Sequence, residues 1–238
     1  SQCGEHPRPR RCREGSSEVS FRGYPRPDGS VGTRNYVAVI PTVVCAAATA
    51  RQISDNVKGS VPFLHNQGCA LTPYDLDMFN RTMTNLGRNP NVAAVVLVSL
   101  GCDPIDIDGI AEGIARSGKP VEKLTIQQVG GTLATVEKGS RIARQMVSDA
   151  SRVERQEFDD AKLMFGAECG GSDTTSGLGS NPAIGSAFDI LVKHGGRATF
   201  SETTEFIGAE HLLAQRAVTP EVGKQIVDMV RRYEQRFL

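Results

Sequence analysis

Four cysteines hold equivalent positions along the chain. Each follows a short apolar run typical of a buried strand, and each precedes a segment that could begin a helix: Cys45, Cys69, Cys102 and Cys169. In a parallel α/β sheet, ligands bind outside the carboxyl ends of the strands. We therefore expect these thiols along one rim of one sheet, where thiolates could bind iron or zinc. Position alone is equally compatible with packing, because cysteine is among the most buried residue types.

Harder ligands lie next to these thiols. His65 precedes the second cysteine by four residues, and Asp103 directly follows the third. The spacing differs from the local pattern of a zinc finger, so only a complete fold could assemble such a site.

A polar, glycine-rich loop follows the fourth strand, from 168 to 181. Such loops expose backbone N–H groups, and a following helix N-terminus favours an anion. The loop lacks the Gly-Lys-Ser/Thr of a Walker motif and the glycine spacing of a dinucleotide fingerprint, which favours a carboxylate over a nucleotide. The alternative is a long turn capped by its own side chains. Asn181 before Pro182 predicts a helix N-cap with proline at the first helical position.

A third cluster lies at 201–211, where a strand end meets a helix start. Glu202, Glu205, Glu210 and His211 could ligate a metal or act as acid and base. Glu202 and Glu205 could instead only stabilise a helix N-terminus. Glu210 and His211 cannot point the same way on one helix, so at least one of these four has a structural role.

An early turn around Pro-Asp-Gly carries Arg26, Asp28, Arg34 and Asn35. Arginine suits bidentate carboxylate binding. A solvated turn with one structural ion pair is the alternative.

Apolar runs alternate with helical patterns between these clusters. We expect strands at 36–43, 61–65, 92–100, 122–128, 162–167 and 197–201, and helices at 46–57, 74–87, 105–117, 132–153, 182–194, 207–215 and 219–238. This alternation predicts an α/β fold: a doubly wound, mostly parallel Rossmann-like sheet with helices on both faces, followed by C-terminal helices. We expect a disordered arm or linker at 1–20, an α/β domain at 21–160, and at 161–238 either a continuation of the sheet or the start of a truncated C-terminal domain.

Composition narrows the function classes. The 27 basic and 27 acidic residues cancel, which argues against binding to nucleic acid or a membrane surface through bulk charge. No apolar run approaches the roughly 20 residues that span a bilayer, and no signal-peptide core is present at the N-terminus. These patterns indicate a cytoplasmic protein. A chain of this size needs no disulfide framework for its six cysteines.

Several motifs together resemble one known family. They lie at 23–36 (Gly-Tyr-Pro-Arg-Pro-Asp-Gly onward), 42–45, 65–69, 100–103, 127–132, 169–185 and 201–211. In order and content they resemble the core of the altronate/galactarate dehydratase family, to which sulfolactate sulfo-lyase large subunits are related. The resemblance covers roughly 21–238.

The resemblance implies a divalent-metal-dependent lyase, with iron(II) favoured over manganese, that converts a sugar acid to a 2-keto-3-deoxy acid. A base removes the α-proton, an acid protonates the leaving hydroxyl, and a metal offsets charge on the carboxylate or enolate. We assign catalytic roles to His65, Asp173, Glu205 and His211. We assign substrate contacts to Arg26, Arg34, Asn35, Gly170, Gly171, Ser172 and Asn181. We assign metal contacts to Cys102, Cys169, Asp103, Glu202, Cys69 and Cys45.

The chain departs from the family pattern in places. The expected Asn-Cys-Ser-Ala is Val44-Cys45-Ala46-Ala47, and the expected His-Gly-x-Gly-Cys-Gly ends in Ala70. Asp103 replaces a usual glutamate, which shifts a ligand by about one methylene. We therefore favour Cys102 and Cys169 as functional thiols and packing roles for Cys45 and Cys69.

The resemblance also suggests partners and alternatives. Family members continue past 238 with a second half and often carry a small β-rich module upstream or as a separate subunit. We expect a homo-oligomer that binds a small sugar acid. The alternatives are a carbon–sulfur lyase on sulfolactate, a non-catalytic fragment that binds a partner module or small acid, and an iron–sulfur cluster on three of the cysteines.

Overall fold

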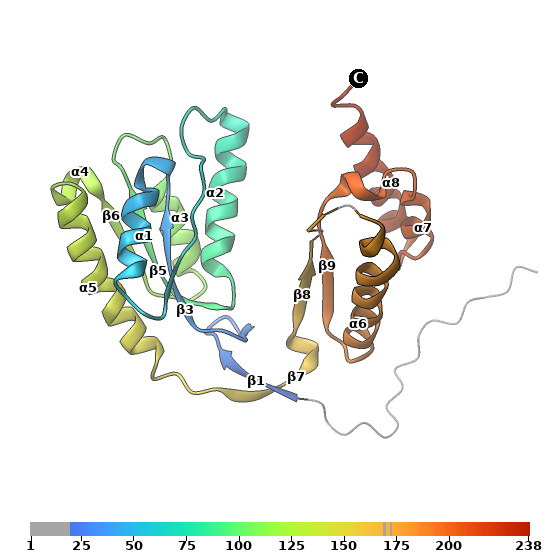
Figure 1. Cartoon of the computed structure of the whole chain (residues 1–238), viewed down its shortest axis with the longest axis horizontal. Coiled ribbons are helices and arrows are strands. Elements are labelled where there is room, and N and C mark those ends of the chain that lie inside the picture. The colour runs from blue at the N-terminus through green and yellow to red at the C-terminus, as the bar shows by residue number, and fades with distance from the viewer. Residues whose placement is uncertain (1–19, 169, 172) are drawn as a thin grey trace, which may run out of the picture. The chain divides into compact units, whose positions relative to one another are not determined.

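The computed structural model describes residues 20–168, 170–171 and 173–238. The chain divides into two compact units, which meet between Asp159 and Asp160 in the sequence (Figure 1). Among the described residues, no helix combines the length and apolar character needed to cross a membrane.

The first unit is built on a four-stranded sheet in which all pairings are parallel. Its strands, in spatial order, are β4 (Ser60–Pro62), β3 (Tyr36–Pro41), β5 (Val92–Ser99) and β6 (Val121–Thr125). The predicted α/β class with a parallel sheet is confirmed. β3 and β5 are nearly continuous apolar runs because both faces of a parallel sheet are covered.

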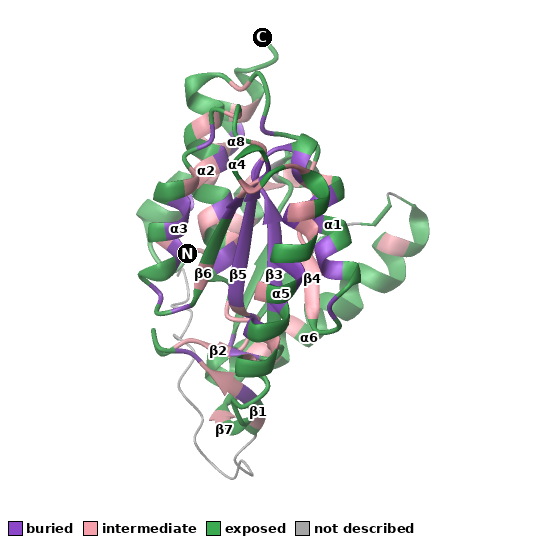
Figure 2. Cartoon of the chain, turned by 90° about the vertical axis from the view of Figure 1, so that its left-hand side faces the viewer, coloured by how far each residue is buried: buried purple, intermediate pink, exposed green. Residues whose placement is uncertain are grey.

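Helices lie on both faces of this sheet. α1 (Ala47–Asp55) and α5 (Thr132–Ala150) pack together over one face, while α2 (Pro73–Arg88) and α3 (Ile107–Ala115) pack together over the other. Alternate β3 residues feed the two cores: Val39 enters the first and Ile40 the second. Figure 2 shows the resulting buried band along β3 and β5 between the helical layers.

A small antiparallel sheet was not predicted. β1 (Ser20–Pro25) pairs with β2 (Val31–Gly32) and with β7 (Gln156–Asp159). The Pro-Asp-Gly turn itself is confirmed, since Gly29 has a φ of +79° and its N–H donates to Arg26 O.

The predicted strand at 122–128 is too long. β6 ends at Thr125 and the chain turns at once into the short helix α4 (Ile126–Val129). Gly130, with a φ of +106°, ends that helix, a conformation that glycine adopts without steric cost. A 3₁₀ turn, η1 (Val44–Ala46), similarly leads from β3 into α1.

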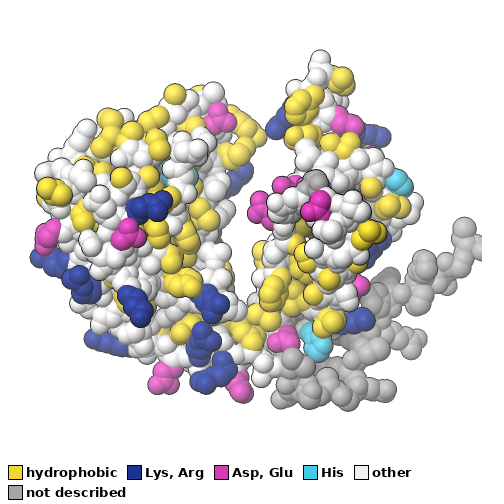
Figure 3. Space-filling view, in the orientation of Figure 1, with side chains coloured by type: hydrophobic (Ala, Val, Ile, Leu, Met, Phe, Trp, Pro, Cys, Tyr) yellow, Lys and Arg dark blue, Asp and Glu magenta, His cyan; other side chains and the backbone are white. Residues whose placement is uncertain are grey.

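The second unit has a two-stranded parallel sheet, β8 (Met164–Ala167) with β9 (Arg197–Phe200). Its helices are α6 (Asn181–Lys193), α7 (Glu210–Gln215) and α8 (Pro220–Glu234), with short 3₁₀ turns η2 (Asp160–Lys162) and η4 (Thr203–Phe206) and a π-helical turn η3 (Ser176–Ser180). Among its described residues, Val230 is the only buried large apolar side chain. Met164 and Phe165 are more than half exposed, and Figure 3 shows hydrophobic side chains over β8.

Both ends of α6 were predicted, with different outcomes. Asn181 is not a side-chain cap, because η3 runs directly into α6 and Asn181 already has helical angles. The left-handed Gly195 after His194 is confirmed: its N–H donates to Val192 O, and Gly196 N–H donates to Leu191 O.

Candidate functional site

Two loops carry Cys45 and Cys69 side by side at the carboxyl edge of the first sheet. Val44 N–H donates to Gln67 O at 2.9 Å, which joins the segment after β3 to the segment after β4. Gly68, at a φ of +107°, lies so close that an added Cβ would be 2.6 Å from Thr42 O. Only glycine permits this approach.

The loop after β5 joins the same edge through Asp103. Thr42 Oγ1 donates to Asp103 Oδ2 at 2.6 Å, while the Leu100 and Gly101 N–H groups donate to Oδ1 at 3.1 and 3.0 Å. Asp103 therefore fixes Cys102, its neighbour, relative to the end of β3. Thr42 lies in a motif used for the resemblance, but no role was predicted for it; its signal is a polar residue at the end of an otherwise apolar buried strand.

We call Cys45, Cys69 and Cys102 the thiol rim. All three thiols are free and exposed, so the predicted packing roles for Cys45 and Cys69 are wrong. The pKa of the Cys69 thiol is raised. Partial desolvation is the largest cause, the neighbouring Cys45 is the second, and Cys102 and Asp103 contribute less. The prediction for Cys169 falls outside the described residues, as does that for Ser172.

His65 is held between two backbone groups. Its Nδ1 accepts from Gln67 N–H at 3.1 Å, so Nε2 carries the proton and donates to Pro41 O at 2.7 Å. The ring also meets Phe79 edge-on, with centroids 5.1 Å apart. Since both nitrogens are engaged, His65 could accept a substrate proton only after giving up one of these bonds.

Thiols such as those of the thiol rim are suitable ligands for a soft metal, but the described residues do not provide a full set of ligands. Among the residues that the structure describes, no group of three or more His, Cys, Asp or Glu side chains could hold a metal ion. Asp103 already accepts three hydrogen bonds. The described residues alone therefore do not fit a metal centre.

The early-turn residues lie at the opposite, amino edge of the sheet. Arg26, only 8% exposed, donates to Pro90 O, Asn35 Oδ1 and Arg34 O at 2.7 to 2.9 Å. Asn35 in turn donates to Ala150 O at 2.8 Å. Arg26 and Asn35 therefore join neighbouring segments of the first unit, which is a structural role. The Arg34 side chain, in contrast, is exposed.

A second buried cation accompanies Arg26 at this edge. Lys119 is 4% exposed and donates to Gly87 O and Asn89 O. Burial, reinforced by Arg26, lowers the pKa of Lys119 to about 8, against an opposing effect of Asp28.

In the second unit, the glycine-rich loop follows the carboxyl end of β8, and the 201–211 cluster follows the carboxyl end of β9. These two strands pair in parallel, so both segments begin at the same edge of the small sheet. Asp173 Oδ1 accepts from Thr175 Oγ1 at 2.6 Å and from Ser176 N–H at 2.9 Å. The hydrogen bond from the Thr175 hydroxyl, and to a smaller extent the one from the Ser176 N–H, holds the pKa of Asp173 below its ordinary value. Ser176 Oγ donates to Gly171 O, so side chains cap the described backbone of this loop, as the capping alternative predicts. Gly170 and Gly171 have open space where a Cβ would lie.

The 201–211 cluster contains one strained residue. Glu202 has a φ of +70° and a ψ of +68°, which is costly for a non-glycine residue and is often found at functional sites. Glu210 accepts from Gly208 N–H at 2.6 Å and so has a local role. The structure gives the Glu205 carboxylate and the His211 ring no hydrogen bond to another described side chain.

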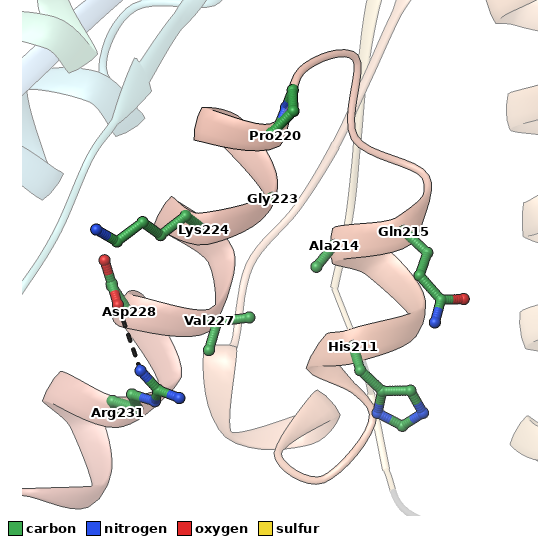
Figure 4. Close-up of a pocket in the computed structure, with 9 residues that line it drawn as sticks. All are labelled: His211, Ala214, Gln215, Pro220, Gly223, Lys224, Val227, Asp228 and Arg231. Carbon is green, nitrogen blue, oxygen red and sulfur yellow. Dashed lines mark ion pairs between the residues drawn. The ribbon is translucent and has the colours of Figure 1, made fainter.

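His211 borders a groove between α7 and α8. Figure 4 shows Ala214 and Val227 between the helices, whereas the His211 ring points away from the charged groups of α8. Of those, Asp228 and Arg231 pair with each other at 3.9 Å. Because the polar groups diverge, the groove has an apolar centre and does not form a convergent anion site.

Comparison with known proteins accounts for both units. The family model described as D-galactarate dehydratase/Altronate hydrolase, second domain, matches residues 23–151. The model described as D-galactarate/Altronate dehydratase, C-terminal, matches residues 161–238. The chain belongs to this family. The resemblance found from the sequence motifs is therefore confirmed.

Within the galactarate/altronate dehydratase family, the relatives differ in their named substrates. The (2R)-sulfolactate sulfo-lyase subunit beta of Chromohalobacter salexigens is 40% identical over 214 residues, which is 90% of this chain and 54% of that protein. The galactarate dehydratase (L-threo-forming) of Escherichia coli is 33% identical over 90% of this chain and 45% of its own length. The altronate dehydratase of Bacillus subtilis is 30% identical over 92% and 46%. The chain thus spans about half the length of these curated relatives.

Proposed function

We propose that this chain is the core of a lyase that removes a β-substituent from a 2-hydroxy carboxylate and produces a 2-keto acid. The observation that carries the proposal is that both units match one family whose named members are lyases on such acids. This reaction is common to the dehydratases and to the sulfo-lyase.

The elimination takes place in three steps. A base removes the proton from C2, the bond between C3 and the leaving group breaks, and an enol forms. The enol then takes a proton at C3 as its hydroxyl loses one, which gives the 2-keto acid. A sugar acid loses its C3 hydroxyl as water after protonation, and sulfolactate loses sulfite. An acid and a base near the same carbon pair are sufficient for either leaving group.

The leaving group separates two candidate functions. Loss of water from a sugar acid is what most of the named relatives suggest. Loss of sulfite from sulfolactate is favoured by the higher identity to the sulfo-lyase subunit, 40% against 30 to 33%. We therefore treat sulfolactate and the sugar acids as equal first substrates.

Within this proposal, acid–base chemistry belongs to side chains that have a free functional group. Among the residues named for catalysis, Glu205 and His211 make no hydrogen bond to another described side chain, so we favour these two. His65 and Asp173 are committed to local hydrogen bonds, which favours positioning roles for both. The glycine-rich loop offers backbone N–H donors suited to a substrate carboxylate.

Iron(II) dependence stays a prediction. A divalent cation would stabilise negative charge on the substrate carboxylate and on the enolate oxygen. The described residues do not complete a site for it, so no step above is assigned to a metal. Metal content after anaerobic purification, compared between the wild type and Cys102→Ser, tests this prediction directly.

We also propose that the active protein contains more than this chain. The relatives are about twice as long, and the sulfo-lyase relative is named as a subunit. The further residues could be continuous with this chain, or they could belong to a second polypeptide such as the predicted upstream β-rich module.

A turnover assay tests the proposal. The chain, alone and together with the half of the sulfo-lyase subunit that it does not match, is incubated with sulfolactate, altronate and galactarate, with and without iron(II). Equal amounts of sulfite and 2-keto acid identify the sulfo-lyase, and 2-keto acid from a sugar acid identifies the dehydratase. Glu205→Gln should lower turnover about 100-fold if Glu205 transfers a proton. Glu234→Gln, an exposed change in the same unit, is the matched control.

A further inference from the structure

Cys45 and Cys69 form a pair of thiols on two loops that the fold holds together. The Val44 N–H to Gln67 O bond lies one residue from Cys45 and two from Cys69. The close contact of Gly68 with Thr42 and Val43 prevents the loops from separating without loss of packing. Both thiols are exposed and free, so a small oxidant can reach them.

We propose that Cys45 and Cys69 are an oxidative modification site, at which a peroxide converts the two thiols to a reversible disulfide. The thiolate of one cysteine attacks the peroxide, the O–O bond breaks, and a sulfenic acid and one water form. The second thiol attacks that sulfur and releases a second water. In total, two thiols and one hydrogen peroxide give one disulfide and two waters.

The third thiol of the rim is less suited to this pairing. Cys102 lies on the loop after β5, which Asp103 holds through two N–H groups of its own loop and through Thr42. No backbone hydrogen bond joins the described residues of that loop to the loop of Cys69.

The same geometry explains why a pair is favoured over a metal centre. A thiol metal site needs three or four ligands, and no such group exists among the described residues. A disulfide needs only two sulfurs, on backbone segments that lie close together, and the Val44–Gln67 bond holds the segments of Cys45 and Cys69 together. The inference does not rest on the proposed lyase function, because disulfide formation is measured without any substrate.

The tryptic peptides make the test direct. Cleavage after lysine and arginine places the three rim cysteines on separate peptides, 35–51, 59–81 and 89–116. The protein, carrying Cys3→Ser and Cys12→Ser to remove the N-terminal thiols, is treated with a chelator and then with equimolar hydrogen peroxide. Remaining thiols are alkylated before digestion and mass spectrometry.

We expect peptides 35–51 and 59–81 to appear as one disulfide-linked species that dithiothreitol separates. Cys102→Ser should leave this species unchanged, and Cys69→Ser should abolish it and leave sulfenic acid or its further oxidation products on Cys45. Sulfinic or sulfonic acid on separate peptides of the wild type, or a dominant link to peptide 89–116, would overturn the proposal. The wild-type map decides the outcome even if a variant fails to fold.

Discussion

Thr42 and Asp103 join the ends of two neighbouring strands through a 2.6 Å hydrogen bond, from the hydroxyl of a residue just after β3 to the carboxylate that follows β5. Thr42 is 1% exposed, so its hydroxyl has no access to bulk water. Removing the hydroxyl should leave Asp103 with one donor fewer in a half-buried place. We expect Thr42→Val to lower the free energy of unfolding by about 1 to 3 kcal/mol in urea titrations. Thr42→Ser keeps the donor and should cost clearly less; equal losses for the two variants would show that the hydrogen bond is not the cause.

Ala70 lies in the left-handed region, with a φ of +53°. A non-glycine residue in this region destabilises the folded state by about 1 to 2 kcal/mol. Glycine removes this steric cost, but its greater conformational freedom in the unfolded state cancels part of the gain. Ala70→Gly should therefore stabilise the protein by about 0.5 to 1 kcal/mol, seen as a higher thermal midpoint.

The matched control for Ala70 is Ala48, an exposed alanine in α1. Ala48→Gly should destabilise by about 0.5 to 1 kcal/mol, because glycine is a poor helix former. Changes of the same sign at the two positions would contradict the assigned backbone conformation.

Lys119 predicts a pH dependence of stability. Its folded-state pKa, about 8, lies below the roughly 10.4 of an unfolded lysine. Between these values the unfolded state binds more protons, so the contribution of this group to stability rises with pH, by about 3 kcal/mol in total. Below pH 8 both states are protonated, and the cost of burying the charge is fully present.

The comparison with Lys119→Met isolates this effect from other groups that titrate at high pH. Urea unfolding between pH 7 and pH 10 should show the wild type gaining stability relative to the variant as the pH rises. A difference that stays constant over this range would mean that the lysine titrates normally in the folded state.

Arg26 should be more important for stability than for substrate binding. Its three hydrogen bonds require the planar guanidinium, which lysine cannot reproduce. We expect Arg26→Lys to cost about 2 to 4 kcal/mol, measured by denaturant unfolding, and Arg34→Lys, at an exposed side chain, to stay within about 0.5 kcal/mol. If both variants unfold like the wild type, the structural role of Arg26 is wrong.

The alternating pattern of the sequence predicted the parallel sheet because each of its strands is a short apolar run. β1 and β7 escaped detection because they are short, carry charged residues such as Arg22 and Glu157, and pair across more than 130 positions. Such a pairing depends on the completed fold and leaves no local signal.

For the site residues too, the sequence predicted some properties, while others depend on the completed fold. Exposure of Cys45 and Cys69 contradicted the packing roles inferred from their sequence context, because a loop crossing through Gly68 covers the backbone beside them and leaves the sulfurs in solvent. Arg26 carries a side chain that often binds carboxylates, yet its partners are carbonyl oxygens that only the folded chain brings near. Residue type predicted which groups can do chemistry, and the fold determined which of them are free to do it.

The central claim is the elimination through an enol, and one measurement tests it most directly. The chain, supplied with the half of the sulfo-lyase subunit that it does not match, is given sulfolactate or a sugar acid in D₂O, and the 2-keto acid is examined by NMR. Elimination predicts one deuterium at C3 of the product, because the enol takes its proton from solvent. A 2-keto acid without deuterium at C3, or no 2-keto acid from either class of substrate by the folded protein, would contradict the account.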